Sequence, residues 1–105
     1  MPKLHDVCQI ISEEILSAVS PFAMDLRQQA FSIAWSAMIT TLGACREDAP
    51  VIIDHLEPIM VQHLAFSSHT SSLAIPPEYH NITPIPDIFS ELYEFSTELV
   101  RRLFP

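Results

Sequence analysis

Histidine side chains are the first candidates for chemistry in this chain, since it contains five of them. His55 and His63 lie eight positions apart on a predicted helix, close to Asp54 and Glu57. Two ligands on one helical face are usually four positions apart, whereas eight residues span about 12 Å of unbroken helix. Pro58 also interrupts this segment. The spacing therefore disfavours a metal site, and it favours partly exposed histidines that titrate near neutrality.

The two cysteines, Cys8 and Cys45, are the next candidates. Cys8 follows His5 by three positions, so a thiol and a base would lie on adjacent turns of a helix. A cysteine nucleophile also needs a field that lowers its pKa, and a strongly acidic chain does the opposite. We expect both thiols to pack as small apolar groups, with no catalytic residue, bound metal or cofactor. A small enzyme or metal-dependent sensor that uses His55, His63 or Cys8 is the alternative.

The composition limits the classes of partner. The chain has 105 residues, which is enough for one domain spanning residues 1–105, and its formal net charge is −8. Such a charge repels phosphate backbones and anionic lipid, so we expect neither nucleic-acid nor membrane-surface binding. Gly43 is the single glycine, which excludes glycine-rich phosphate loops. Hydrophobic residues reach 49% and charged residues only 17%, so the apolar surplus predicts a protein partner.

The cellular compartment is predicted from two segments. The opening MPKLHDVCQII carries charged residues before any apolar run and has no small-residue cleavage site, so it is unlike a secretory signal. Residues 28–45 carry no charge, but glutamine, serine and threonine interrupt a run that a membrane span would need to keep apolar. We therefore expect a cytoplasmic protein with a buried helix here.

Helical spacing of apolar residues predicts the first two elements. A first helix is predicted over about residues 4–19, with an apolar stripe through Leu4, Cys8, Ile11, Ile15 and Ala18. Ser20-Pro21 resembles a helix start, and Gly43 could supply a left-handed C-terminal cap, so a second helix is predicted between them.

The second predicted helix is apolar on two sides. One side carries Phe22, Leu26, Ile33 and Ala37, and the other carries Phe31, Trp35, Met38 and Leu42. Such a helix is either the centre of a monomeric core or in contact with another chain. We predict contact with another chain, so that this helix forms a homodimer or partner interface. Its candidate anchors are Phe31, Trp35 and Met38, with Phe89 and Tyr93 of the last helix.

The remaining elements complete an all-α prediction: a small bundle of four main helices. Asp48 and Pro50 start a third helix that runs to about Phe66, with a bend or break at Pro58. Residues 67–86 are rich in proline and serine and predict one long loop, held by contact or disordered. A last helix opens at Pro86-Asp87. Its predicted inward stripe is Ile88, Leu92, Phe95, Leu99 and Leu103, and its predicted solvated acidic stripe is Asp87, Glu91, Glu94 and Glu98.

In its length, its opening MPKLHDVCQIISEEIL and its helical layout, the chain resembles the QslA-type quorum-sensing anti-activators, a group of small bacterial proteins. The resemblance covers the whole chain and rests on no local motif. It implies a homodimer that binds the ligand-binding domain of a LuxR-type transcriptional activator. Binding would block the activator's own dimerisation and its attachment to DNA, without catalysis or a cofactor.

Overall fold

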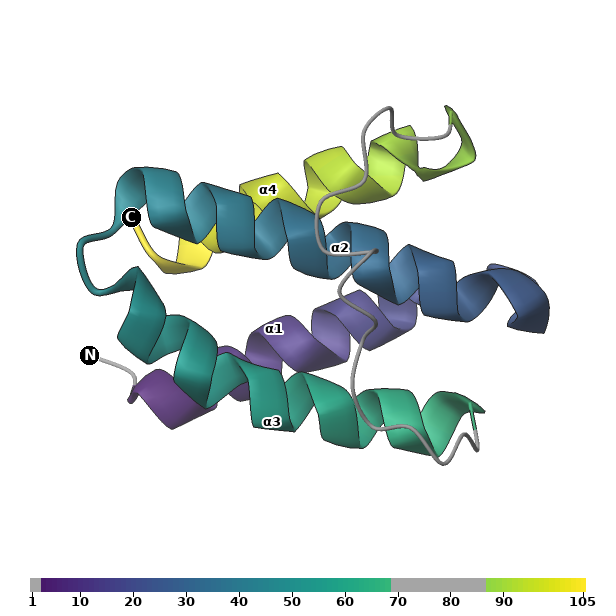
Figure 1. Ribbon diagram of the computed structural model, residues 1–105, viewed down its shortest axis with the longest axis horizontal. Helices are drawn as coiled ribbons and strands as arrows, with labels where there is room; N and C mark the ends of the chain where they lie inside the picture. Colours follow the sequence, from purple (N-terminus) through teal and green to yellow (C-terminus); the bar gives the residue numbers. More distant parts are fainter. Residues whose placement is uncertain (1–2, 69–86) are drawn as a thin grey trace.

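The computed structural model describes residues 3–68 and 87–105, and in these ranges the protein is all-helical (Figure 1). The helices are α1 (Leu4–Val19), α2 (Met24–Cys45), α3 (Ala49–Ser68) and α4 (Ser90–Leu103). A short 3-10 helix, η2 (Asp87–Phe89), leads directly into α4. The predicted all-α bundle of four main helices is confirmed, while the predicted loop over 67–86 falls almost entirely outside the described residues.

The four helices form a bundle in which α1 and α3 run in one direction and α2 and α4 run in the other (Figure 1). The most extensive contacts join α2 to α4 and α1 to α3, and α2 also packs closely on α3. The contact between α1 and α4 is slighter. Helix α1 contacts α2 about as little as it contacts α4, so its boundaries with these two helices are the least extensive of the bundle.

The first helix matches its prediction, but Ser20 has a different role from the expected one. It closes α1, because its backbone keeps helical angles and its N–H donates to the carbonyl of Leu16. The Arg27 side chain reaches back from α2 and donates to the carbonyls of Ser20 and Phe22. These bonds stabilise a non-helical link, so α2 begins at Met24 rather than at Pro21.

The end of α2 also differs from the prediction. Gly43 lies inside the helix, which continues to Cys45, and it has no left-handed backbone angle. The helix ends at Arg46, whose backbone is extended and whose guanidinium pairs with Asp48 at 2.9 Å. Arg46 also donates to the carbonyl of Pro105 and lies over the ring of Phe104. The residue that closes this turn is therefore an arginine with three partners, not a glycine.

The third helix begins at Ala49, next to the predicted cap Asp48, and passes through Pro58 without dividing into two helices. Pro58 is exposed, so its ring points away from the core. The N-terminal half of α3 packs on α1 and places His55 against His5, with ring centroids 5.7 Å apart. His55 therefore contacts a histidine of another helix.

Candidate functional site

The candidate anchors of the second helix are core residues, which corrects the interface prediction. Every residue from 30 to 38 is buried within the single chain. Phe31 and Met38 are completely buried, Trp35 is 2% exposed and Phe89 is 1% exposed, while Tyr93 is only partly buried. The helix is apolar on two sides because it packs against both α4 and α3 and also touches α1. Four of the five predicted anchors are therefore unavailable to a partner.

The side chains considered for catalysis and metal binding are Cys8, His55 and His63. Cys8 is completely buried, and this burial raises the pKa of its thiol to about 11. A thiol with such a pKa is almost wholly protonated at neutral pH and is a poor nucleophile. No group of three or more histidine, cysteine, aspartate or glutamate side chains among residues 3–62 and 87–105 is placed to hold a metal ion. The side chain of His63 lies outside the described part.

Large apolar side chains are exposed elsewhere, two of them on η2 and on the outer face of α4. Ile88 is 59% exposed and Phe95 is 38% exposed, although both belong to the stripe that the sequence predicted to point inward. The buried face of this helix is instead rotated toward Phe89, Ser96 and Val100. Ser96 is completely buried, and its hydroxyl donates to the Leu92 carbonyl one turn earlier at 2.8 Å. The core therefore accepts Ser96, and the ring of Phe95 remains in contact with solvent.

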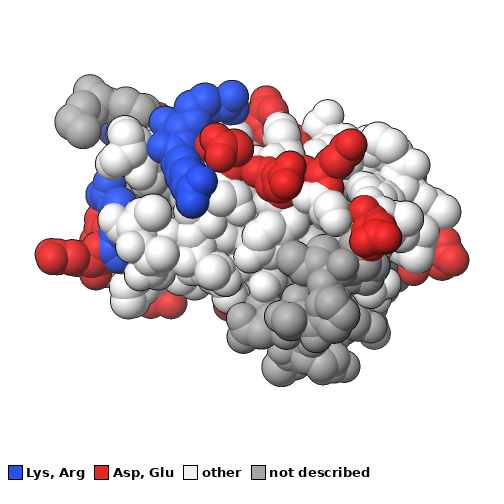
Figure 2. All heavy atoms as spheres, turned by 90° about the horizontal axis from the view of Figure 1, so that it is seen from above, with Lys and Arg blue, Asp and Glu red and all other residues white. Residues whose placement is uncertain are grey.

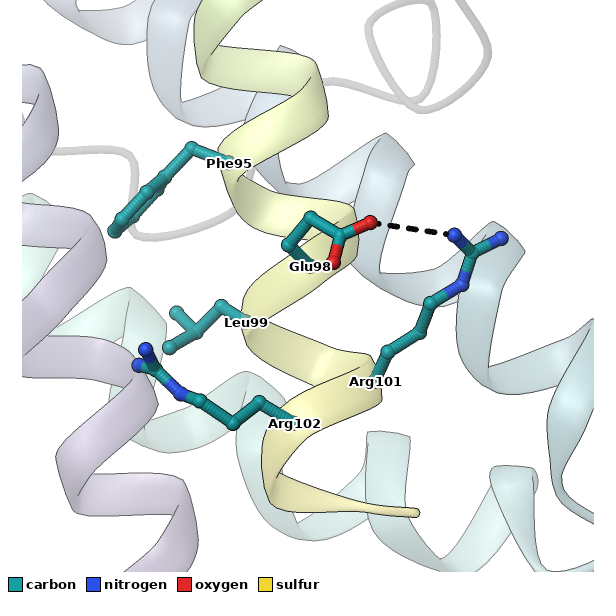
Figure 3. A pocket seen from close by; sticks show the side chains of 5 residues that line it. All are labelled: Phe95, Glu98, Leu99, Arg101 and Arg102. Atoms are coloured by element: carbon teal, nitrogen blue, oxygen red, sulfur yellow. Dashed lines mark hydrogen bonds and ion pairs between the residues drawn. The ribbon is translucent and has the colours of Figure 1, made fainter.

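Phe95 borders two open hollows, of which the first lies between α1 and α4 and the second lies on the surface of α4 itself. One hollow, of about 220 Å³, is lined by Ala18, Phe22, Ile88, Glu91, Leu92 and Phe95. The other, of about 400 Å³, is lined by Phe95, Glu98, Leu99, Arg101 and Arg102. In Figure 3 the side chains of Phe95, Leu99 and Arg102 extend to the same side of α4, toward α1. We call this surface the α1–α4 seam.

Charged side chains border the α1–α4 seam. The Arg101 side chain extends to the side of α4 opposite Phe95 and pairs with Glu98 at 3.4 Å (Figure 3). The face of the molecule that carries α4 shows acidic side chains in a row, with basic side chains beside one end of the row (Figure 2). Both members of the Arg101–Glu98 pair are well exposed, so the pair is a weak contributor to stability. The seam thus combines an apolar centre with charges of both signs.

A further hollow of about 430 Å³ lies at the turn between α2 and α3, lined by Cys45, Arg46, Glu47, Asp48 and Pro105. Two of its charged groups, Arg46 and Asp48, are already partnered: the hydrogen bond from Arg46 holds the pKa of Asp48 below its ordinary value. Arg46 is in turn fixed by Pro105 and Phe104. This hollow is therefore a product of how the chain closes its turn, and the α1–α4 seam is the better candidate for a binding site.

Comparison of the chain with protein-family models, with curated proteins and with solved structures found no match. The helices in the described ranges include none that is both long enough and apolar enough to span a membrane.

The seam was not predicted, although the sequence carries a signal for it. The predicted inward stripe of the last helix lay beside a second apolar set, Phe89, Tyr93, Val100 and Phe104, and one helix face could not bury both. Choosing between the two sets required knowing that Ser96 could enter the core. Burying a serine costs little free energy when its hydroxyl donates to a carbonyl of its own helix. Treating Ser96 as solvent-facing because it is polar therefore gave the wrong rotation of the last helix.

Proposed function

We propose that this chain is a non-enzymatic protein-binding module that inhibits its partner by covering a surface the partner needs. The observation that supports this proposal is the exposure of Phe95 and Ile88 beside the hollows of the α1–α4 seam. A half-exposed aromatic ring in a concave apolar setting is typical of the anchors that dominate protein interfaces. The seam therefore replaces Phe31, Trp35, Met38 and Phe89 as the proposed binding surface.

The partner we propose is the ligand-binding domain of a LuxR-type transcriptional activator, as the resemblance to QslA-type anti-activators implies. In this proposal the chain is cytoplasmic, forms a homodimer and prevents the activator from dimerising and binding DNA. Occupancy of the activator would then depend on the difference between two affinities, that of the inhibitor and that of the activator for itself. No cofactor enters this mechanism.

A purified LuxR-type activator provides the test. Its release from a labelled operator is followed by fluorescence anisotropy while the inhibitor is added, and complex formation is measured by calorimetry. We expect Phe95→Ala to weaken the complex at least tenfold, which corresponds to about 1.4 kcal/mol. The matched control is Val51→Ala, because Val51 is 62% exposed on α3 and does not line the seam.

Circular dichroism of both variants must first show an unchanged fold. The proposal is wrong if the natural chain neither binds the activator nor releases it from DNA. It is also wrong about the surface if Phe95→Ala inhibits as well as the natural chain does.

A further inference from the structure

Two histidines from different helices lie against each other on the surface. His5 is in the first turn of α1 and His55 is in the N-terminal half of α3, and these parts of the two helices lie at the same end of the bundle (Figure 1). The centroids of the two imidazole rings are 5.7 Å apart, and the ring planes are nearly perpendicular, at 83°. Both residues are exposed. The pair lies outside the α1–α4 seam, because neither histidine lines its hollows.

The distance between the rings suits a metal ion held by one nitrogen of each. A zinc ion lies about 2 Å from a bound imidazole nitrogen, and therefore about 3 Å from the centroid of that ring. Two rings on one ion then have centroids about 5 Å apart at the tetrahedral angle, and about 6 Å apart when the two nitrogens are opposite. The observed 5.7 Å lies between these limits. The backbones of α1 and α3 therefore already hold the two rings at a chelating distance.

The rings have only to turn in order to share an ion. In an edge-to-face contact the two rings do not both point at one centre, so a rotation about the bond from Cβ to the ring is required. This last torsion of a histidine has a broad energy minimum, so the rotation costs little. Because both residues are exposed, the rings have room to turn and water can fill the remaining coordination positions.

Charges near the pair favour a cation. Asp6 follows His5 directly, and Asp54 and Glu57 flank His55, while only one lysine and no arginine lie within five positions of either histidine. All three acids are exposed. They supply a negative potential but no third ligand, because no group of three or more histidine, cysteine, aspartate or glutamate side chains among residues 3–62 and 87–105 is placed to hold a metal ion. The arrangement is a chelate of two ligands, which binds an ion reversibly.

We propose that His5 and His55 form a two-histidine site for a divalent late first-row metal ion, represented by Zn²⁺. Imidazole nitrogen is a preferred ligand of such ions, whereas Mg²⁺ prefers oxygen. The ion bridges α1 and α3, and water completes its coordination. The two ligands are brought together by the folded chain, so bound zinc stabilises the fold. This inference is independent of the proposed function, because neither histidine belongs to the α1–α4 seam.

Zinc chloride added to the whole chain is the probe. Long-range proton–nitrogen NMR spectra report on each histidine ring separately. We expect the ring signals of His5 and His55 to shift together and to reach their end point at the same zinc concentration, while the melting temperature rises. Magnesium chloride at the same concentrations should produce neither effect, because its ion prefers oxygen ligands.

Single substitutions separate a chelate from two independent histidines. His5→Asn and His55→Asn each remove one arm, so each should weaken zinc binding by about tenfold or more, since the second arm of a chelate binds at a high effective concentration. The matched control is His63→Asn, because His63 lies eight positions farther along α3, about 12 Å from His55. Cys45→Ser is the second control, because it removes an exposed thiol that is itself a zinc ligand type. Both controls should bind zinc at the His5–His55 pair as the natural chain does.

The proposal is overturned if the signals of His5 and His55 shift at different zinc concentrations or do not shift, which would mean adventitious zinc at separate side chains only. It is also overturned if either single variant keeps the natural affinity, or if a control loses as much affinity as His55→Asn does. The NMR titration uses the natural chain, so it decides the question even where a variant fails to fold. None of these results bears on binding of the activator, which is measured separately.

Discussion

The thiol of Cys8 is completely buried among apolar side chains, and burial has a measurable consequence for this one residue. The ordinary pKa of 9.0 is raised to about 11 in the folded protein, because a buried thiolate loses its hydration. The unfolded chain therefore releases this proton at lower pH than the folded chain does. The contribution of the Cys8 thiol to the free energy of unfolding is therefore fully present below about pH 9, and it is lost as the pH rises toward 11.

We predict a fall of about 2 to 3 kcal/mol in the free energy of unfolding between these pH values that depends on Cys8. Urea denaturation at a series of alkaline pH values measures it. Cys8→Ala should remove this component of the fall, although its stability starts lower, because a smaller side chain leaves a cavity. Cys45→Ala is the matched control and should retain the component, because Cys45 is exposed. An identical alkaline loss in both variants would contradict the prediction.

Among the elements, α1 and α3 were predictable because their signals are local. Their apolar spacing acts within a few residues along the chain. The ends of α2 were not predictable in this way. Its start depends on Arg27 reaching back to the carbonyls of Ser20 and Phe22. Its end depends on Arg46, which is held by Phe104 and Pro105 at the far end of the chain.

The candidate site shows the same limit. Sequence periodicity identified α4 as amphipathic but did not fix which apolar residues are buried, because the choice depends on how α4 meets α2. It assigned Phe95 to the core and Trp35 to an interface, and the structure reverses both assignments. What the sequence did indicate correctly was an excess of apolar residues beyond one buried stripe per helix.

Replacing Gly43 with alanine tests whether this glycine lies inside the helix or caps its end. The change in the free energy of unfolding has the opposite sign in the two cases. An added Cβ would meet no atom within 4 Å, and the backbone angle is not left-handed. Gly43→Ala should therefore raise the free energy of unfolding by about 0.5 to 1 kcal/mol, because alanine loses less backbone entropy in a helix. Ala44→Gly, the reverse change at the next exposed position of α2, should lower it by a similar amount. Destabilisation by Gly43→Ala in urea denaturation would restore the predicted C-terminal cap.

At the scale of the whole molecule, the four helices share one apolar core. Buried residues of α1, α2, α3 and α4 form a single contiguous cluster, with Trp35 among them. A core of this kind is expected to unfold cooperatively, since no helix keeps its apolar partners when another leaves. Trp35 is the only tryptophan of the chain, so its fluorescence reports on that core directly.

We predict that Trp35→Ala lowers the free energy of unfolding by roughly 3 to 5 kcal/mol. Thermal and urea denaturation followed by circular dichroism measure the change. Val51→Ala is the control, and it should have little effect because Val51 is largely exposed. If Trp35→Ala leaves stability unchanged but weakens association, the tryptophan is an interface anchor after all.

Three buried hydroxyls, those of Ser32, Thr41 and Ser96, each donate to the carbonyl one turn earlier in their own helix. These groups satisfy their polarity without holding one helix in a fixed position against another. At those points the helices are kept in register by the shapes of apolar side chains, which have no directional bond to preserve. In an evolving lineage such a core can exchange leucine for isoleucine or methionine through small compensating shifts. The spacing of apolar positions, at intervals of three and four residues, would then be conserved more strongly than the identities of the residues at those positions.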